Sequence, residues 1–248
     1  MPVRGHPALA PAGDLRCERS MNDYSFEFGG TRLVARPAGT LYWPAMRLLC
    51  VADLHLGKAE RMARRGGTML PPYEAEDTLD RLAAEIDATE PAHVVALGDS
   101  FDDTRAAAAL PEAVRDRIAT LAAARDLTWI TGNHDPSTCG QPGDSAAERT
   151  CPPLTFRHIA VPGTMGEVSG HYHPKARLAL GGGSVARRCF LIDRTRIVLP
   201  AFGTYTGGLE TTAPELCALM EADAVAVLTG RRALPVPMPR GGGVRRSA

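Results

Sequence analysis

The chain has 248 residues, of which 44% are hydrophobic and 23% charged, as in ordinary soluble globular proteins. Basic and acidic residues both number 28, and this zero net charge argues against a protein that coats nucleic acid, so any DNA contact must come from a local patch. No apolar stretch is long enough for a membrane span or a signal peptide, and the six cysteines form no C-x-x-C pair. We therefore expect a cytoplasmic protein with reduced cysteines and no thiolate zinc site.

The predicted elements of the first half alternate between strands and helices. Gly29-Gly30 predicts a hairpin turn, and a short LYW strand follows it. Apolar runs and apolar residues repeating every three to four positions then predict strands at 47–53, 93–98 and 127–131, and helices at 57–65, 73–88 and after Pro111. This β-α-β-α-β order predicts parallel strands joined by right-handed crossovers.

The second half is predicted to be rich in strands. The segment Cys139–Pro153 is expected to be an exposed loop, and a short helix is expected near 213–221. Strands are expected at 154–160, 166–171, 176–180, 185–192, 195–199 and 224–228. We therefore expect an α/β fold of two sheets packed face to face with helices outside, as a single domain over 21–235 between disordered segments 1–20 and 236–248.

Four of the apolar runs end in clusters of Asp, Asn and His. In open α/β sheets the ligand crevice lies outside the carboxyl ends of the strands, so the side chains of these clusters are expected to meet. Mixed oxygen and imidazole ligands suit Mn, Fe or Zn better than Ca or Mg. The clusters are Asp53-Leu54-His55, Gly98-Asp99, Gly132-Asn133-His134-Asp135 and His171-Tyr172-His173.

These residues supply the ligands that a pair of divalent ions requires. Two ions about 3.5–4 Å apart can clamp the attacking and leaving oxygens of a phosphoryl displacement, and a water between them becomes a hydroxide nucleophile near neutral pH. Asp53, His55 and His173 are assigned to one ion, Asn133, His158 and His171 to the other, and Asp99 to both.

His134 directly follows an expected ligand and is the candidate general acid, or a cation that faces the developing negative charge. Asp135 is expected to orient the His134 imidazole through its other nitrogen. Each motif alone also occurs in turns and at strand edges, and the joint occurrence of the motifs favours a metal site. His158 lies within an expected strand, where a structural histidine is the alternative interpretation.

A basic helix face follows the first motif. Lys58, Arg61 and Arg65 are spaced to share one face of the helix and are candidates for contacts with substrate phosphates. The alternative is a solvated face whose partner is Glu60 or water. Phe202 and Tyr205, in the AFGTYTGG segment, are expected to pack that loop rather than to stack on a base.

These motifs, in this order, resemble those of the calcineurin-like metallophosphoesterase superfamily over residues 47–173. The superfamily pattern D-x-H, G-D-x-x-D, G-N-H-[DE], a lone His and G-H-x-H corresponds here to 53–55, 98–102, 132–135, His158 and 170–173. The resemblance implies a four-layer αββα sandwich of two mixed sheets. It also implies a dinuclear centre, commonly manganese or iron with a second divalent ion.

Three further segments resemble the bacterial ligase-associated DNA damage response endonucleases (PdeM). They are ADLHLGKAERMARRGGTMLPP (52–72), GHYHP (170–174) and LPAFGTYTGGL (199–209). This resemblance implies a DNA-repair nuclease that works beside an ATP-dependent DNA ligase, an exonuclease and a helicase. A phosphoesterase for a cyclic nucleotide or a phosphomonoester, and a binding module that has lost its chemistry, are the alternatives.

Overall fold

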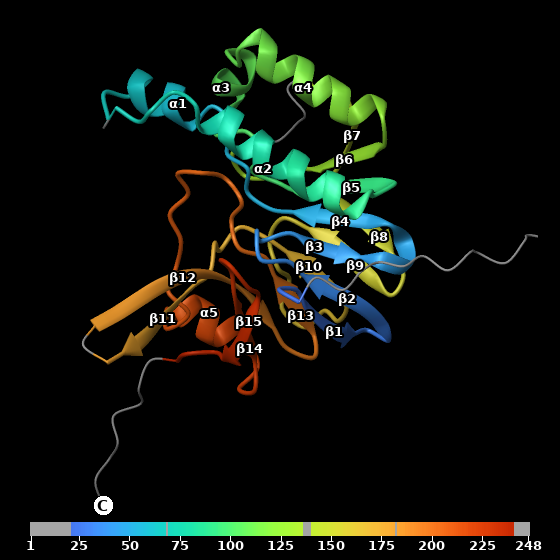
Figure 1. Cartoon of the computed structure of the whole chain (residues 1–248), viewed down its shortest axis with the longest axis vertical. Helices are drawn as coiled ribbons and strands as arrows, with labels where there is room; N and C mark the ends of the chain where they lie inside the picture. The colour runs from blue at the N-terminus through green and yellow to red at the C-terminus, as the bar shows by residue number, and fades with distance from the viewer. Residues whose placement is uncertain (1–20, 68, 136–139, 182, 241–248) are drawn as a thin grey trace, which may run out of the picture.

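The computed structural model describes residues 21–67, 69–135, 140–181 and 183–240 (Figure 1). Two mixed β-sheets form the centre, and helices lie on their outer faces, which confirms the predicted α/β class and αββα layering. The predicted disordered segment 1–20 lies outside the described residues, as do residues 241–248 of the one predicted for 236–248.

The first sheet has seven strands whose spatial order follows the chain. The first three pairings are antiparallel and the last three are parallel. Gly29 and Gly30, with φ of 58° and 76°, form the predicted hairpin turn between the first two strands. The strands are β1 Tyr24–Phe28, β2 Thr31–Ala35, β3 Leu41–Trp43, β4 Leu48–Val51, β5 His93–Leu97, β6 Asp126–Ile130 and β7 Asp144–Ala146.

Helices cover the outer face of this sheet. In helix α2 Glu74–Thr89, Leu79, Leu82 and Ile86 are buried at the predicted spacing. Helix α3 Thr104–Ala108 was not predicted, because five residues are too few to show a helical period. It begins after Asp103, whose side chain accepts a hydrogen bond from the Ala106 amide. The helices are the 3-10 turn η1 Pro44–Met46, α1 Lys58–Arg64, α2 Glu74–Thr89, α3 Thr104–Ala108 and α4 Glu112–Ala123.

The second sheet is built from the C-terminal half of the chain. Its strand order is β15-β14-β12-β13-β10-β9-β8, and β11 pairs with β12. The short helix α5 Pro214–Leu219 packs on its outer face. The strands are β8 Glu148–Cys151, β9 Leu154–Arg157, β10 Glu167–Ser169, β11 Lys175–Leu180, β12 Gly183–Ile192, β13 Arg196–Val198, β14 Val225–Leu228 and β15 Leu234–Pro237.

In two places the structure contains strands that the sequence did not predict. The expected loop Cys139–Pro153 contains β7 and β8, which are short, polar and largely exposed and so carry no apolar signal. The second sheet also extends beyond residue 235, because β15 pairs with β14. Pro235 and Pro237 are tolerated there because β15 lies at the sheet edge, where a backbone donor is not needed.

Three apolar clusters separate the four layers. One lies between helices α2 and α4 and the first sheet, with Leu79 and Ile118 fully buried. The second lies between the sheets and joins Leu97 of the first to Phe190 of the second. The third packs Leu216 of α5 against the second sheet. The two sheets are therefore held face to face by apolar packing, and the ends of their strands point to a shared edge.

Candidate metal centre

The predicted ligands come from the ends of strands in both sheets. Asp53, Asp99 and Asn133 follow β4, β5 and β6 of the first sheet. His158 follows β9, and His171 and His173 follow β10, in the second sheet. The site therefore lies where the two sheets meet.

The backbone at these positions is unusual. Residues other than glycine rarely adopt positive φ, and the left-handed conformation costs about 1–3 kcal/mol where it is held. In the described part of the chain, two non-glycine residues outside the site share it, and both end helical turns: Arg47 and Glu90. The site residues with positive φ are Asp53 (54°), His55 (48°), Asp99 (46°), His171 (71°) and His173 (47°). Concentration of strain at one place is typical of a functional site.

Two motif glycines are required by close approach. A Cβ on Gly132 would collide with the carboxylate and the amide nitrogen of Asp99. A Cβ on Gly170 would lie 2.7 Å from Oδ2 of Asp53. The glycines before Asn133 and His171 therefore leave space for the acidic side chains that the neighbouring strands deliver.

The first ligand set consists of Asp53, His55 and His173, whose ligand atoms lie within 4.8 Å of one another. Nε2 of His173 lies 3.2 Å from Oδ1 of Asp53 and 3.4 Å from Nε2 of His55. The carboxylate of Asp53 has no exposed surface and accepts a hydrogen bond from the His171 amide at 3.0 Å. The structure thus brings together the three residues assigned to one ion.

The second set consists of Asp99, His158 and His171, again with ligand atoms within 4.8 Å. Nε2 of His158 lies 2.9 Å from Oδ1 of Asn133, 3.2 Å from Nδ1 of His171 and 3.4 Å from Oδ2 of Asp99. These are the residues assigned to the second ion. His158 directly follows β9, and its side chain is buried within this cluster.

The donor set fits divalent cations. Nδ1 of His158 contacts the Leu97 carbonyl oxygen at 2.8 Å, and because a carbonyl only accepts, this nitrogen carries the proton. Nδ1 of His55 likewise donates to the Asp102 carboxylate at 2.8 Å. With Nδ1 as the protonated nitrogen, Nε2 of each ring faces the cluster and can offer its lone pair to a metal ion.

The electrostatics of the second set also favour a cation. Burial raises the pKa of Asp99, but its contacts with His158 and His134 outweigh burial and lower the pKa to about 2. Burial lowers the pKa of His158, yet Asp99 and Asp53 raise it overall. Burial and the neighbouring His158 lower the pKa of His171. The Asp99 carboxylate thus stays ionised and draws positive charge to the position that Nε2 of His158 faces.

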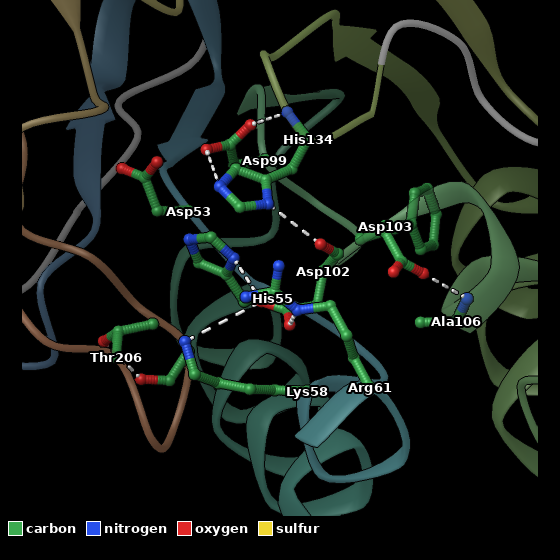
Figure 2. A network of polar contacts seen from close by, with 12 residues as sticks. Asp53, His55, Lys58, Arg61, Asp99, Asp102, Asp103, Ala106, His134 and Thr206 are labelled. Atoms are coloured by element: carbon green, nitrogen blue, oxygen red, sulfur yellow. Dashed lines mark hydrogen bonds and ion pairs between the residues drawn. The ribbon is translucent and has the colours of Figure 1, made fainter. Parts of the chain in front are cut away.

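Asp102 joins the first ligand set to helix α1. Figure 2 shows its buried carboxylate between His55, Lys58 and Arg61. Lys58 Nζ lies 3.7 Å away, and Arg61 forms an ion pair with the other oxygen. Burial raises the pKa of Asp102, but the His55 hydrogen bond and the two cations lower it overall. Although Asp102 also lies near His55 and His134 in a third cluster, the two cations that it faces disfavour a metal ion there.

His134 lies beside the second ligand set. Its backbone amide donates to Oδ1 of Asp99 at 2.9 Å, and its Nε2 lies 4.0 Å from Oδ2 of the same residue. The ring is oriented by the Asp102 carbonyl oxygen, which accepts from Nδ1 at 2.9 Å. Its side chain is 30% exposed, so Nε2 remains accessible beside the ligand cluster.

The expected role of Asp135 in orienting His134 is wrong. The Asp135 carboxylate is buried and accepts hydrogen bonds from backbone amides that surround it. Burial raises its pKa to about 6. It fixes the loops that carry Asp99 and Asn133, and it does so by binding the amides of Asp99, Ser100, Phe101 and Gly132.

The basic helix face is only partly available for substrate. Lys58 and Arg61 lie against Asp102, with side chains 19% and 17% exposed. Arg64 pairs with Glu60 and Asp103, whereas Arg65, at the end of α1, is exposed. Asp102 is thus a partner for this face that the sequence did not reveal.

Two arginines, Arg81 and Arg188, contact the loop that follows β13. Phe202 is completely buried, with the Arg81 guanidinium 4.5 Å from its ring centre, so it packs the loop as expected. Arg188, half-buried on β12, donates hydrogen bonds to the carbonyl oxygens of the loop. Those carbonyls belong to Ala201, Phe202, Gly203 and Thr204. A single arginine in a strand gives no sequence signal for this function.

Three further observations concern residues away from the centre. Nδ1 of His93 lies 3.0 Å from a carboxylate oxygen of Asp126 on the next strand, which fits a structural role. The four described cysteines are free: Cys50, Cys151, Cys189 and Cys217. Within the described ranges, no helix has the length and apolar character needed to cross a bilayer.

Comparisons with known proteins agree with this geometry. The family model described as calcineurin-like phosphoesterase matches residues 46–185. A crystal structure of the Pseudomonas putida nuclease MPE is similar, with a TM-score of 0.69 and 30% sequence identity, and the match covers 87% of this chain and 100% of that one. A search of curated proteins found no significant match.

Proposed function

Because this chain belongs to the calcineurin-like phosphoesterase family and is a metal-dependent phosphoester hydrolase, we propose that it hydrolyses phosphodiester bonds within DNA as an endonuclease. The observation that carries this proposal is the meeting of two ligand sets, Asp53–His55–His173 and Asp99–His158–His171, between the two sheets. Asn133 adds an oxygen to the second set. This mixture of carboxylate, amide and imidazole suits manganese best, with iron or zinc as alternatives.

Each group in the site has a distinct task. Two bound divalent ions would activate a water near neutral pH and neutralise charge on the phosphodiester. His134 donates a proton from Nε2 to the leaving oxygen while Nδ1 stays bonded to the Asp102 carbonyl. The Asp102 carboxylate holds the tautomer of His55 in which Nε2 is free to ligate.

A DNA substrate is supported by the relative and by the surface next to the site. The similar Pseudomonas putida protein is a nuclease. Arg65 is exposed at the end of α1, and Lys58 is partly exposed nearer the centre. We assign both to phosphates beside the scissile bond, whereas Arg61 supports Asp102. The segments that resemble ligase-associated endonucleases lead us to propose a role in DNA repair, with an ATP-dependent ligase, an exonuclease and a helicase as partners.

The test is a comparison of substrates with manganese-loaded protein. We expect cleavage of single-stranded or duplex DNA with internal products, and cleavage of bis(p-nitrophenyl) phosphate as a generic diester. Cyclic nucleotides should be poor substrates, because they lack the flanking phosphates that Lys58 and Arg65 would contact. Efficient hydrolysis of a cyclic nucleotide or a phosphomonoester, with intact DNA, would instead identify a small-molecule phosphoesterase.

A further inference from the structure

An open cavity of about 380 Å³ lies directly beside the second ligand set. Asn133 and His158 line it, so one side of the cavity is the metal centre itself. Its volume is within the range of small-molecule sites, about 300–1,000 Å³. A substrate strand whose phosphate sits at the metal centre must extend away from it, and this cavity borders the centre at Asn133 and His158.

Another wall of the cavity is apolar and exposed. Ile159 and Val161, on the loop after β9, line the cavity with 43% and 42% of their surfaces accessible. Both belong to the same short loop that carries His158. Large apolar side chains at a site for a polyanion have no electrostatic use, because they cannot bind phosphate, but they can contact the face of a base.

The charges of the cavity argue for a base rather than a phosphate. Among the described residues, the cation that lines the cavity is Arg157, whose Nη2 lies 2.9 Å from Glu148 and whose Nε lies 3.5 Å from buried Glu167. Glu148 lines the same cavity and would repel a phosphate. Two carboxylates thus already balance the arginine, and the lining offers apolar surface without excess positive charge.

We propose that this cavity binds the base of a nucleotide adjacent to the scissile phosphodiester, with Ile159 and Val161 as its apolar wall. The inference rests on the proposed nuclease function and adds to it a place where substrate is recognised through its base. It also separates two kinds of contact, because Lys58 and Arg65 serve phosphates while this loop serves a base.

The experiment compares kcat/KM of the manganese-loaded wild type and the double variant Ile159→Ala, Val161→Ala on an oligonucleotide and on bis(p-nitrophenyl) phosphate. The kcat/KM on the oligonucleotide divided by the kcat/KM on the aryl diester should fall about tenfold in the variant, since buried apolar contact with the base is lost. The salt dependence of oligonucleotide cleavage should stay the same, because no phosphate contact is removed. The single variant Ile159→Phe should keep this ratio at the wild-type value or raise it, because an aromatic face stacks on bases.

The matched control is Leu234→Ala, an exposed apolar residue on the edge strand β15, and its ratio should equal that of the wild type. An unchanged ratio in the double variant would overturn the inference. Equal loss on both substrates would also overturn it, because the loop would then act only by positioning His158. A wild-type protein that cleaves the aryl diester but no oligonucleotide contradicts the nuclease function itself, and the base subsite falls with it.

Discussion

Nδ1 of His55 lies 2.8 Å from Oδ1 of Asp102, a carboxylate with no exposed surface. Lys58 and Arg61 contact the same carboxylate from helix α1, so two cations compensate its negative charge. Partners of this kind fix the orientation of a ligating imidazole and increase its basicity. The helix after the D-x-H motif therefore supports a metal ligand, in addition to any contact with substrate.

Asp102→Asn should weaken manganese binding by about 10–100-fold, because the amide cannot match the charge of the carboxylate that faces His55 and two cations. Titration calorimetry of the metal-free protein measures this directly. The neighbouring variant Asp103→Asn is the control, because Asp103 caps α3 and pairs with Arg64 but contacts no ligand of either set. It should cost about 1 kcal/mol of stability or less and leave manganese affinity unchanged. Equal affinities for both variants would remove Asp102 from the metal centre.

His134→Ala should reduce kcat for DNA by about 10²–10⁴-fold while the protein still binds two ions. The reason is geometric: the His134 side chain is 30% exposed beside Asp99, and the ring does not belong to either ligand set. Metal content by elemental analysis and turnover should be measured on the same preparation. Loss of one ion would show that His134 is a ligand and not the proton donor.

Asp99→Ala should leave a protein that retains neither ion firmly. Asp99 is the expected bridging ligand, and its carboxylate also accepts a hydrogen bond from the His134 amide. His173→Ala, which removes a member of the first set only, should lose one ion and is the matched comparison. Elemental analysis after gel filtration distinguishes the two outcomes. Retention of one ion by both variants would contradict a bridging role for Asp99.

Arg65→Ala should weaken binding to an oligonucleotide and reduce the slope of log K against log salt by about 0.7–0.9, the contribution of one phosphate contact. Arg64→Ala is the control in the same helix, since its guanidinium is already paired with Glu60 and Asp103. Binding should be measured by fluorescence anisotropy at several salt concentrations. Identical slopes for both variants and the wild type would place the DNA elsewhere.

The sequence was sufficient to predict the strands that carry the site and the grouping of its residues. Short apolar runs marked β4, β5 and β6, and Asp53, Asp99 and Asn133 follow them as expected. Because these strands are parallel, their carboxyl ends lie at one edge of the sheet, and residues far apart in the sequence lie close together there. A structural role was the alternative interpretation of His158 from the sequence. In the structure its Nε2 lies 3.2 Å from Nδ1 of His171.

Other features depend on contacts that no local pattern encodes. Asp135 follows His134 directly, yet its carboxylate turns to the backbone amides of a neighbouring loop. The ion pair between Arg61 and Asp102 joins a helix to a loop 41 residues later, and neither residue signals the other. Strands β7 and β8 form because their backbones pair with the neighbouring strands β6 and β9. The periodicity of their side chains does not reveal this pairing.

The two ligand sets take members from both sheets, and this has a mechanical consequence. Asp53 and Asp99 come from the first sheet, and His158, His171 and His173 come from the second. Cations bound between them cross-link the two halves of the sandwich at one rim, so chelation should loosen that rim while the backbone ladder within each sheet persists. The same ions that activate water would thereby keep the halves of the enzyme in register.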